Sequence, residues 1–397
     1  MTEVTWQKLK EWTYKCIGCR SCITEYKKTF PHHRFDYICP FDYQEKSFTY
    51  SPAGKIRVIN GILEEVVPID MHAAEILYMD PLCKACENDC LADHGNHIVD
   101  IFVAARERFV EEGILPTKVK EFLENVDKYG NPWGEPMGKR AEWAKNVKGV
   151  KKYEKGDEYL LYVGCIESFD PIGQKIPSAF AELLAMAEVS FGILGEQEIC
   201  SGNDVRLLGE KGLFEMLVEK NMKTFKDLKV EKIVVISPHA YNAFKNTYLQ
   251  YGKMPEVIHY TQLLHKLIKG GKLKLSGLDT KITYHDPCFL GRYNNLYDEP
   301  REILKSIPGV EIVEMKRNKE YAFCCGGGSG NFYMDYLKGD DAPNRVRVRE
   351  AYNAGAKIIA VACGGCATLL NDGIKSEDLE GKIEVMDIAE IVKKALA

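Results

Sequence analysis

Residues 323–326 read Phe-Cys-Cys-Gly, and this cysteine pair stands between two further groups, Cys288 and Cys363-Gly364-Gly365-Cys366. The gaps between the three groups are 35 and 37 residues long. Neighbouring side chains on an extended backbone point in opposite directions, so a turn must bring Cys324 and Cys325 to one site. Thiolates select iron–sulfur clusters or zinc, and this pattern offers more sulfur than a four-coordinate zinc ion uses. It predicts a cluster site made of Cys288, Cys324, Cys325, Cys363 and Cys366.

The pattern resembles the cysteine-rich CCG domain of heterodisulfide reductases of the D type and of their iron–sulfur relatives. The signature there is a cysteine, a long gap, Cys-Cys-Gly, a similar gap and CxxC. The resemblance extends to Tyr284–Arg292, which reads YHDPCFLGR, and to Phe323–Gly326. It implies that the five cysteines are catalytic residues that hold one noncubane four-iron cluster in an oxidoreductase subunit.

Short apolar strands alternate with helical segments in the C-terminal part of the chain. The clearest expected strands are 159–163, 233–236, 282–284 and 358–362. This alternation is typical of parallel α/β units. In such sheets the ligand site lies beyond the carboxyl ends of the strands, where Cys165, Cys288 and Cys363 fall.

The same region contains an internal repeat. Leu161–Cys165 parallels Thr283–Cys288, and Cys200-Ser201-Gly202 parallels Cys324-Cys325-Gly326. We therefore expect two copies of one CCG unit, a degenerate copy over 156–275 and an intact copy over 276–397.

The first copy lacks most of the ligands. Ser201 replaces the second cysteine of the pair, and Ser237-Pro238-His239-Ala240 stands where CxxC is expected. Serine is a poor ligand for soft metals, so only Cys165, Cys200 and His239 remain as candidate ligands. These are too few, and we expect no noncubane cluster there. We interpret the two cysteines as buried remnants of a duplication. The alternative is that the emptied cavity became a pocket in which His239 acts as an acid or base.

The first part of the chain carries two more cysteine groups. Helical spacing of apolar residues at 73–78 and 101–106 predicts an α-helical ferredoxin-like domain over 1–125. A linker over 126–155, rich in helix breakers and then in solvated lysines, is expected to follow. The fold class is thus α+β multidomain, with a helical domain before two parallel-sheet CCG units. The expected ligands of cubane clusters are Cys16, Cys19, Cys22, Cys39, Cys83, Cys86 and Cys90.

The number of cubane clusters stays open between two interpretations. CxxCxxC followed by a distant Cys-Pro is typical of two-cluster ferredoxins, but Asp89 and Asp93 stand where the regular spacing needs cysteines. Either Cys39, Cys83, Cys86 and Cys90 hold a full cubane and the first triplet takes a non-cysteine ligand, or one cluster is a three-iron species. Candidate non-cysteine ligands are Asp93, His94 and His97, although both histidines also fit ordinary surface positions.

Composition and length favour a globular protein in a reducing, anaerobic cytoplasm. The chain has 397 residues, 45% hydrophobic and 28% charged, with a formal net charge of −5, so nothing indicates nucleic-acid binding. The first twelve residues contain no apolar stretch of the signal-peptide kind, and the longest apolar runs are too short to span a bilayer. Any association with a membrane complex would be peripheral and would need a partner.

The resemblance implies an iron–sulfur subunit of a larger redox complex. The leading hypothesis is an oxidoreductase in which electrons pass between cubane clusters and the noncubane cluster, which acts on a disulfide, persulfide or thiol. His285, Asp286 and Arg292 flank Cys288 and are candidates for supplying a proton, for anchoring an anionic substrate, or for supporting the site. The alternative is a pure relay between a flavoprotein and a quinone-reactive membrane subunit or ferredoxin. A zinc-binding module fits poorly, because paired cysteines with distant partners do not have zinc-ribbon spacing.

Overall fold

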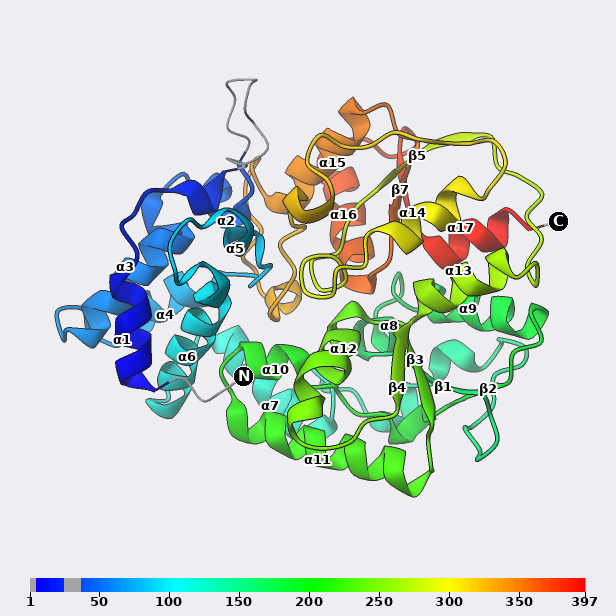
Figure 1. The fold of residues 1–397 in the computed structure, drawn as a ribbon, viewed down its shortest axis with the longest axis horizontal. Helices are drawn as coiled ribbons and strands as arrows, with labels where there is room; N and C mark the ends of the chain where they lie inside the picture. The colour runs from blue at the N-terminus through cyan, green and yellow to red at the C-terminus, as the bar shows by residue number, and fades with distance from the viewer. Residues whose placement is uncertain (1–4, 25–36, 397) are drawn as a thin grey trace.

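The structure is a computed structural model that describes residues 5–24 and 37–396. Part of the segment assessed for a signal peptide, residues 1–4, lies outside this range. The N-terminal region is helical, drawn in blue and cyan in Figure 1. Its helices are α1 (Trp6–Tyr14), α2 (Pro40–Glu45), α3 (Pro52–Leu63), α4 (Met71–Tyr78), α5 (Ala85–Asp89), α6 (Ile98–Glu111) and α7 (Thr117–Tyr129).

Local sequence explains where several of these helices begin and end. The Ser51 side chain accepts a hydrogen bond from the Gly54 N–H and Pro52 opens α3, a combination that favours a helix start. Gly130, with φ of 66°, ends α7 in the left-handed conformation. The predicted helical segments 73–78 and 101–106 lie inside α4 and α6 and are confirmed.

The segment after α7 is less exposed than the sequence indicates. It forms two short 3₁₀ turns, Met137–Lys139 and Glu142–Ala144. The expectation of a solvated segment is wrong for Arg140 and Trp143, which are 2% and 7% exposed. These side chains pack inward because they meet residues far along the chain, which local composition does not reveal.

Two parallel four-stranded sheets follow. The first contains β1 (Tyr159–Tyr162), β2 (Phe191–Ile193), β3 (Lys232–Val235) and β4 (Glu256–His259) in the order β2-β1-β3-β4. The second contains β5 (Thr280–Tyr284), β6 (Val310–Ile312), β7 (Ile358–Val361) and β8 (Glu384–Asp387) in the order β6-β5-β7-β8. The four expected strands coincide with β1, β3, β5 and β7. Because the strand order is also the same in both sheets, the duplicated α/β architecture is confirmed.

Helices cover both sheets. We call β1 to α13 the first unit and β5 to α17 the second unit; they are drawn mainly in green and in yellow to red in Figure 1. The first unit contains α8 (Cys165–Phe169), α9 (Lys175–Met186), α10 (Asn203–Leu207), α11 (Lys211–Asp227), α12 (Pro238–Asn242) and α13 (Tyr260–Lys269). The second unit contains α14 (Asp298–Lys305), α15 (Pro343–Asn353), α16 (Gly364–Ser376) and α17 (Ile388–Lys394).

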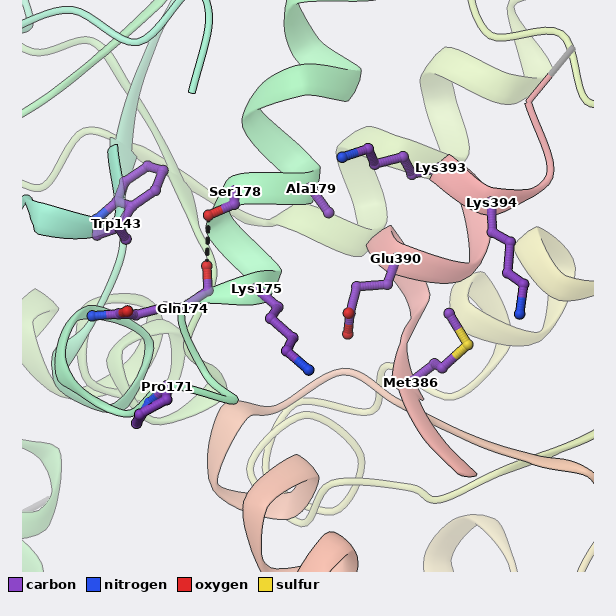
Figure 2. Close-up of a pocket in the computed structure, with 10 residues that line it drawn as sticks. All are labelled: Trp143, Pro171, Gln174, Lys175, Ser178, Ala179, Met386, Glu390, Lys393 and Lys394. Carbon is purple, nitrogen blue, oxygen red and sulfur yellow. Dashed lines mark hydrogen bonds between the residues drawn. The ribbon is translucent and has the colours of Figure 1, made fainter. Parts of the chain in front are cut away.

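The two units pack directly against each other. The Tyr260 hydroxyl, at the start of α13, donates to the buried carboxylate of Asp387 in the second unit at 2.7 and 2.8 Å. Beside this contact, residues of α9 and α17 line the surface pocket shown in Figure 2. Its Lys393 is paired with Glu182 at 2.6 Å, and no cysteine or histidine stands among the described residues that line it.

Within the described residues, the helices are too short or too polar to cross a bilayer.

Candidate metal centre

The second unit gathers its five cysteines at the carboxyl ends of its strands. Cys288 follows β5, Cys363 follows β7, and Cys366 lies in the first turn of α16. All five cysteines are buried, each 8% exposed or less. The sulfurs of Cys325 and Cys366 are 3.4 Å apart, and the Cys324 thiol interacts electrostatically with Cys288 and Cys325. The structure therefore brings together the predicted set.

The turn expected at the adjacent pair is present. Gly326 has φ of 94°, and its N–H donates to the Cys324 sulfur at 3.3 Å. A Cβ at Gly328 would lie 2.4 Å from the carbonyl oxygen of Pro81, so only glycine permits this approach to the helical region. The glycines thus let a backbone N–H reach a sulfur and the neighbouring region pack close.

The pKa values of Cys363 and Cys325 are lowered at this site, whereas interactions with neighbouring cysteines raise the pKa values of Cys324 and Cys366. A hydrogen bond from Cys366 and the contact with His239 lower the pKa of Cys363 to about 5, although burial opposes the shift. Hydrogen bonds from Cys324 and Cys366 likewise lower the pKa of Cys325. Since the thiolate is the form that binds metal, the lowered pKa values of Cys363 and Cys325 favour ligation.

A histidine also lies at the thiol cluster. The donor atoms of His285, Cys325 and Cys366 lie within 4.8 Å of one another, and all three residues are buried. His285 Nδ1 is 3.0 Å from the Nε of Arg347, which donates to it. Arg347 therefore fixes the orientation of the ring beside the sulfurs.

The other two flanking residues hold the site in place. Arg301 makes a paired interaction with Asp286 at 2.7 and 2.9 Å. Arg292 donates from Nε to the carbonyl of Cys83 at 2.6 Å and from Nη1 to the carbonyl of Ala322 at 2.7 Å. Both Asp286 and Arg292 are thus engaged in contacts within the protein, and Arg292 joins the second unit to the helical region.

Two residues of the first unit face this site, and sequence reasoning placed neither of them there. His239 lies in the cavity wall with Cys288 and Cys363, and its ring packs on Phe289 with centroids 4.4 Å apart. Although burial lowers the His239 pKa, the adjacent Asp204 carboxylate and Cys363 hold it well above its ordinary value. His239 therefore lines the cavity of the second unit.

Glu167 is the second of these residues and was missed by the sequence. It is fully buried and accepts a hydrogen bond from the Gly364 N–H at 3.2 Å. Burial, and then the charge of Cys363, raise its pKa to about 8. Only its position two residues after Cys165 could have drawn attention to it.

The cysteines of the helical region form two neighbourhoods, and Cys22 lies between them. Cys39, Cys83 and Cys86 line one cavity together with Pro40 and Asp80. Cys90 instead interacts electrostatically with Cys16 and Cys19, while Cys22 lies near Cys16, Cys39 and Cys90. The structure therefore associates Cys90 with the first triplet.

The candidate non-cysteine ligands lie away from the cavity of Cys39. His94 Nε2 is 3.8 Å from the Cys90 sulfur, and His97 stacks on Trp12 with centroids 4.2 Å apart. Neither histidine, nor Asp93, is among the residues that line that cavity. Its Asp80 is held in a 2.7 Å ion pair with the buried Lys55.

The helical region and the second unit contact each other near Cys83. The Cys83 carbonyl accepts a hydrogen bond from Arg292 at 2.6 Å, and the Cys83 thiol interacts electrostatically with Cys324 of the second unit. Arg292 lies against the same contact and interacts with Cys83, Cys288 and Cys324. A soft donor set that is buried, partly ionised and reached by a backbone N–H fits an iron–sulfur cluster.

Comparisons with known proteins agree with this chemistry. The model of the CCG cysteine-rich domain matches residues 159–245 and 282–371. A probable iron–sulfur-binding oxidoreductase, FadF, of Bacillus subtilis is 39% identical over 338 residues, which are 82% of this chain and 47% of the relative. The EtfAB:quinone oxidoreductase of Syntrophomonas wolfei is 37% identical, over 84% of this chain and 48% of the relative. The chain thus spans about half the length of these relatives.

A third relative is covered more fully. It is the D-type subunit of the dihydromethanophenazine:CoB–CoM heterodisulfide reductase of Methanosarcina barkeri, which is 33% identical over 323 residues. The match covers 79% of this chain and 76% of the relative.

Proposed function

The chain belongs to the family of CCG-domain iron–sulfur proteins that includes the D-type heterodisulfide reductases, and from this premise we propose that it is an electron-transferring oxidoreductase subunit. Electrons pass between cubane clusters in the helical region and one noncubane cluster in the second unit. The observation that supports the proposal is the contact at Cys83, whose carbonyl accepts a hydrogen bond from Arg292 at 2.6 Å and whose thiol interacts with Cys324, because the two proposed ligand sets would then be neighbours.

We assign the ligands of the cubane clusters from their neighbourhoods. Cys16, Cys19, Cys22 and Cys90 provide four thiols for one cluster. Cys39, Cys83 and Cys86 provide three for the other, which suits a three-iron cluster or a cubane with one non-cysteine ligand. The proposed domains are a helical domain over 1–125, a linker over 126–155 and CCG units over 156–275 and 276–397. Because α7 continues to Tyr129, the boundary at 125 falls within that helix.

The noncubane site takes the five cysteines of the second unit. When bound there, such a cluster supplies single electrons and an iron atom that accepts a sulfur ligand. The protein supplies the surroundings: Gly326 donates a backbone hydrogen bond to sulfur, and Arg292 balances the negative charge of the thiolates. His239 and Glu167 place two groups that exchange protons near Cys363.

The leading substrate class is a disulfide, persulfide or thiol. Cleavage of a sulfur–sulfur bond consumes two electrons, and the resulting thiols take up protons. A site that combines thiolate ligands with two proton-exchanging groups, His239 and Glu167, therefore suits this reaction. The name of the Methanosarcina relative, a heterodisulfide reductase subunit, supports the same class.

The second candidate function is a relay without a substrate of its own. It is favoured by the name of the Syntrophomonas relative, an EtfAB:quinone oxidoreductase. The partners would be a flavoprotein on one side and a quinone-reactive membrane subunit or ferredoxin on the other. Any association of this chain with a membrane complex would then be peripheral and would depend on that partner.

Electron paramagnetic resonance separates the two functions. Anaerobically purified protein is poised oxidised and measured with and without small thiols. A new thiol-dependent signal that is lost in Cys363→Ser is expected for the catalytic subunit. Signals that are present but indifferent to every thiol would contradict catalysis at this site and favour the relay.

A further inference from the structure

The first unit retains two cysteines that the proposed clusters do not use. Cys165 begins α8 directly beyond β1, and Cys200 follows the turn after β2. Their thiols lie close enough to interact electrostatically with each other, and the Gly202 N–H donates to the Cys200 sulfur at 3.4 Å. Cys200 is buried and Cys165 is half-buried. The pair thus lies at the carboxyl end of β1, which is the strand of the first unit that corresponds to β5 in the second unit.

A buried arginine contacts one of these two cysteines. The Arg140 side chain is 1% exposed, and its Nη2 donates to the Cys165 sulfur at 3.3 Å. The same nitrogen and Nε donate to Glu198 at 3.2 and 3.3 Å. Glu198 in turn accepts from the N–H groups of Val163 and Gly164, at 3.0 and 2.9 Å. The guanidinium is therefore fixed against one particular sulfur.

Two buried cysteines would not by themselves require a buried arginine and glutamate beside them. A neutral thiol packs as a small hydrophobe and requires no cation. Burying a guanidinium is costly unless its charge and its N–H groups are matched. Among the residues that the structure describes, Nη1 of Arg140 has no hydrogen-bond partner, so the guanidinium retains an unmatched N–H beside this site. Although Glu198 already pairs with this cation, the guanidinium also donates to the Cys165 sulfur, and a cation in this position favours the thiolate over the thiol.

The two thiols have different roles. The hydrogen bond from Cys200 and the charge of Arg140 lower the pKa of Cys165 to about 7, whereas the pKa of Cys200 is raised. A thiolate attacks disulfides, and a neighbouring thiol resolves the product. Cys165 therefore has the properties of the attacking residue and Cys200 those of the resolving residue.

We propose that Cys165 and Cys200 form a redox-active dithiol that exchanges with low-molecular-weight disulfides, a function separate from the cluster chemistry. The Cys165 thiolate attacks one sulfur of the external disulfide, forms a mixed disulfide and releases one thiolate. The Cys200 sulfur then attacks Cys165, the Cys165–Cys200 bond forms, and the second external thiol leaves with the Cys200 proton. The external disulfide is reduced to two thiols by the two electrons that the protein dithiol loses.

The test uses the full, cluster-containing chain under anaerobic conditions. It is treated with 2-hydroxyethyl disulfide, a small neutral disulfide that can reach a half-buried thiol; free thiols are then alkylated and the protein is digested without reductant. Mass spectrometry is expected to find a peptide that links Cys165 to Cys200, two hydrogens lighter than the dithiol. Dithiothreitol should restore both thiols, and the iron content should stay constant.

Two matched variants distinguish the roles. Cys200→Ser should trap the reagent on Cys165 as a mixed disulfide, whereas Cys165→Ser should leave Cys200 as a free thiol. Recovery of both cysteines as alkylated thiols from oxidant-treated wild type would overturn the proposal. So would loss of iron in Cys165→Ser, because it would make that residue a cluster ligand.

Discussion

The two α/β units have one topology and different contents at the ends of their strands. The second unit presents Cys288, Cys325, Cys363 and Cys366 around one cavity, with Cys324 beside Cys288 and Cys325. The first unit keeps only Cys165 and Cys200, and a buried arginine donates to the Cys165 sulfur. The comparison teaches that the copy that lost three thiols still contributes to its neighbour: His239 lines the cavity of the second unit, and Glu167 accepts a hydrogen bond from the Gly364 N–H.

The largest expected effect is a difference between the two units in how substitutions change the cluster spectra. Cys363→Ser should abolish the noncubane signal and leave the cubane spectrum intact, because it removes a buried ligand from the second unit only. Restoring one lost cysteine in the first unit, by Ser201→Cys at the position that corresponds to Cys325, should add no signal, since the CxxC pair is still absent there. Electron paramagnetic resonance of both variants checks this, and a Cys363→Ser protein with an unchanged spectrum would refute the ligand assignment.

The second prediction concerns the ion pair that holds the strand end of the second unit. Arg301→Met should lower the free energy of unfolding by about 3–5 kcal/mol, because it leaves Asp286 buried without its partner. Lys281→Met is the control, since its pair with Glu311 is about half exposed, and it should change stability by less than about 0.5 kcal/mol.

Anaerobic denaturant unfolding followed by circular dichroism measures both variants. Equal losses in the two proteins would show that the buried pair has no special role.

A smaller effect is expected on the reactivity of the first unit. The pKa of Cys165 is lowered from 9.0 to about 7, so its thiolate, and with it the rate of alkylation, should rise with pH to half its maximum near pH 7. Arg140→Met should move this midpoint upward, and Arg140→Lys should restore part of the shift because it keeps the charge. The ionisable groups that interact with Cys165 are Cys200, Arg140, Glu198, Tyr162 and Tyr333.

Mass spectrometry of Cys165 after short pulses of iodoacetamide at several pH values provides the rates. A wild-type midpoint near 9, or an Arg140→Met profile identical to wild type, would contradict the role of the guanidinium.

The sequence predicted most of what is local. Strands such as 358–362 are continuous apolar runs, and the repeat around Cys165 and Cys288 indicated the duplicated topology. The turn at Cys324 and Cys325 followed from backbone geometry, because adjacent side chains otherwise diverge.

What the sequence did not predict depends on packing between distant segments. Arg140 stands in a lysine-rich stretch, and nothing nearby shows that it reaches Cys165. His239 was expected beside Cys165 and Cys200 but faces the other unit, because the relative placement of the two sheets leaves no local pattern. The association of Cys90 with Cys16 and Cys19 is likewise a long-range contact.

The most direct test of the central claim is the iron content of two equivalent variants, Cys288→Ser in the second unit and Cys165→Ser in the first. With three four-iron clusters the anaerobic protein holds about 12 irons per chain, or one fewer if a cubane is a three-iron species. We predict that Cys288→Ser loses about four of them, the content of one cluster, and that Cys165→Ser loses none. Equal iron contents in the two variants, whether both reduced or both unchanged, would contradict the claim.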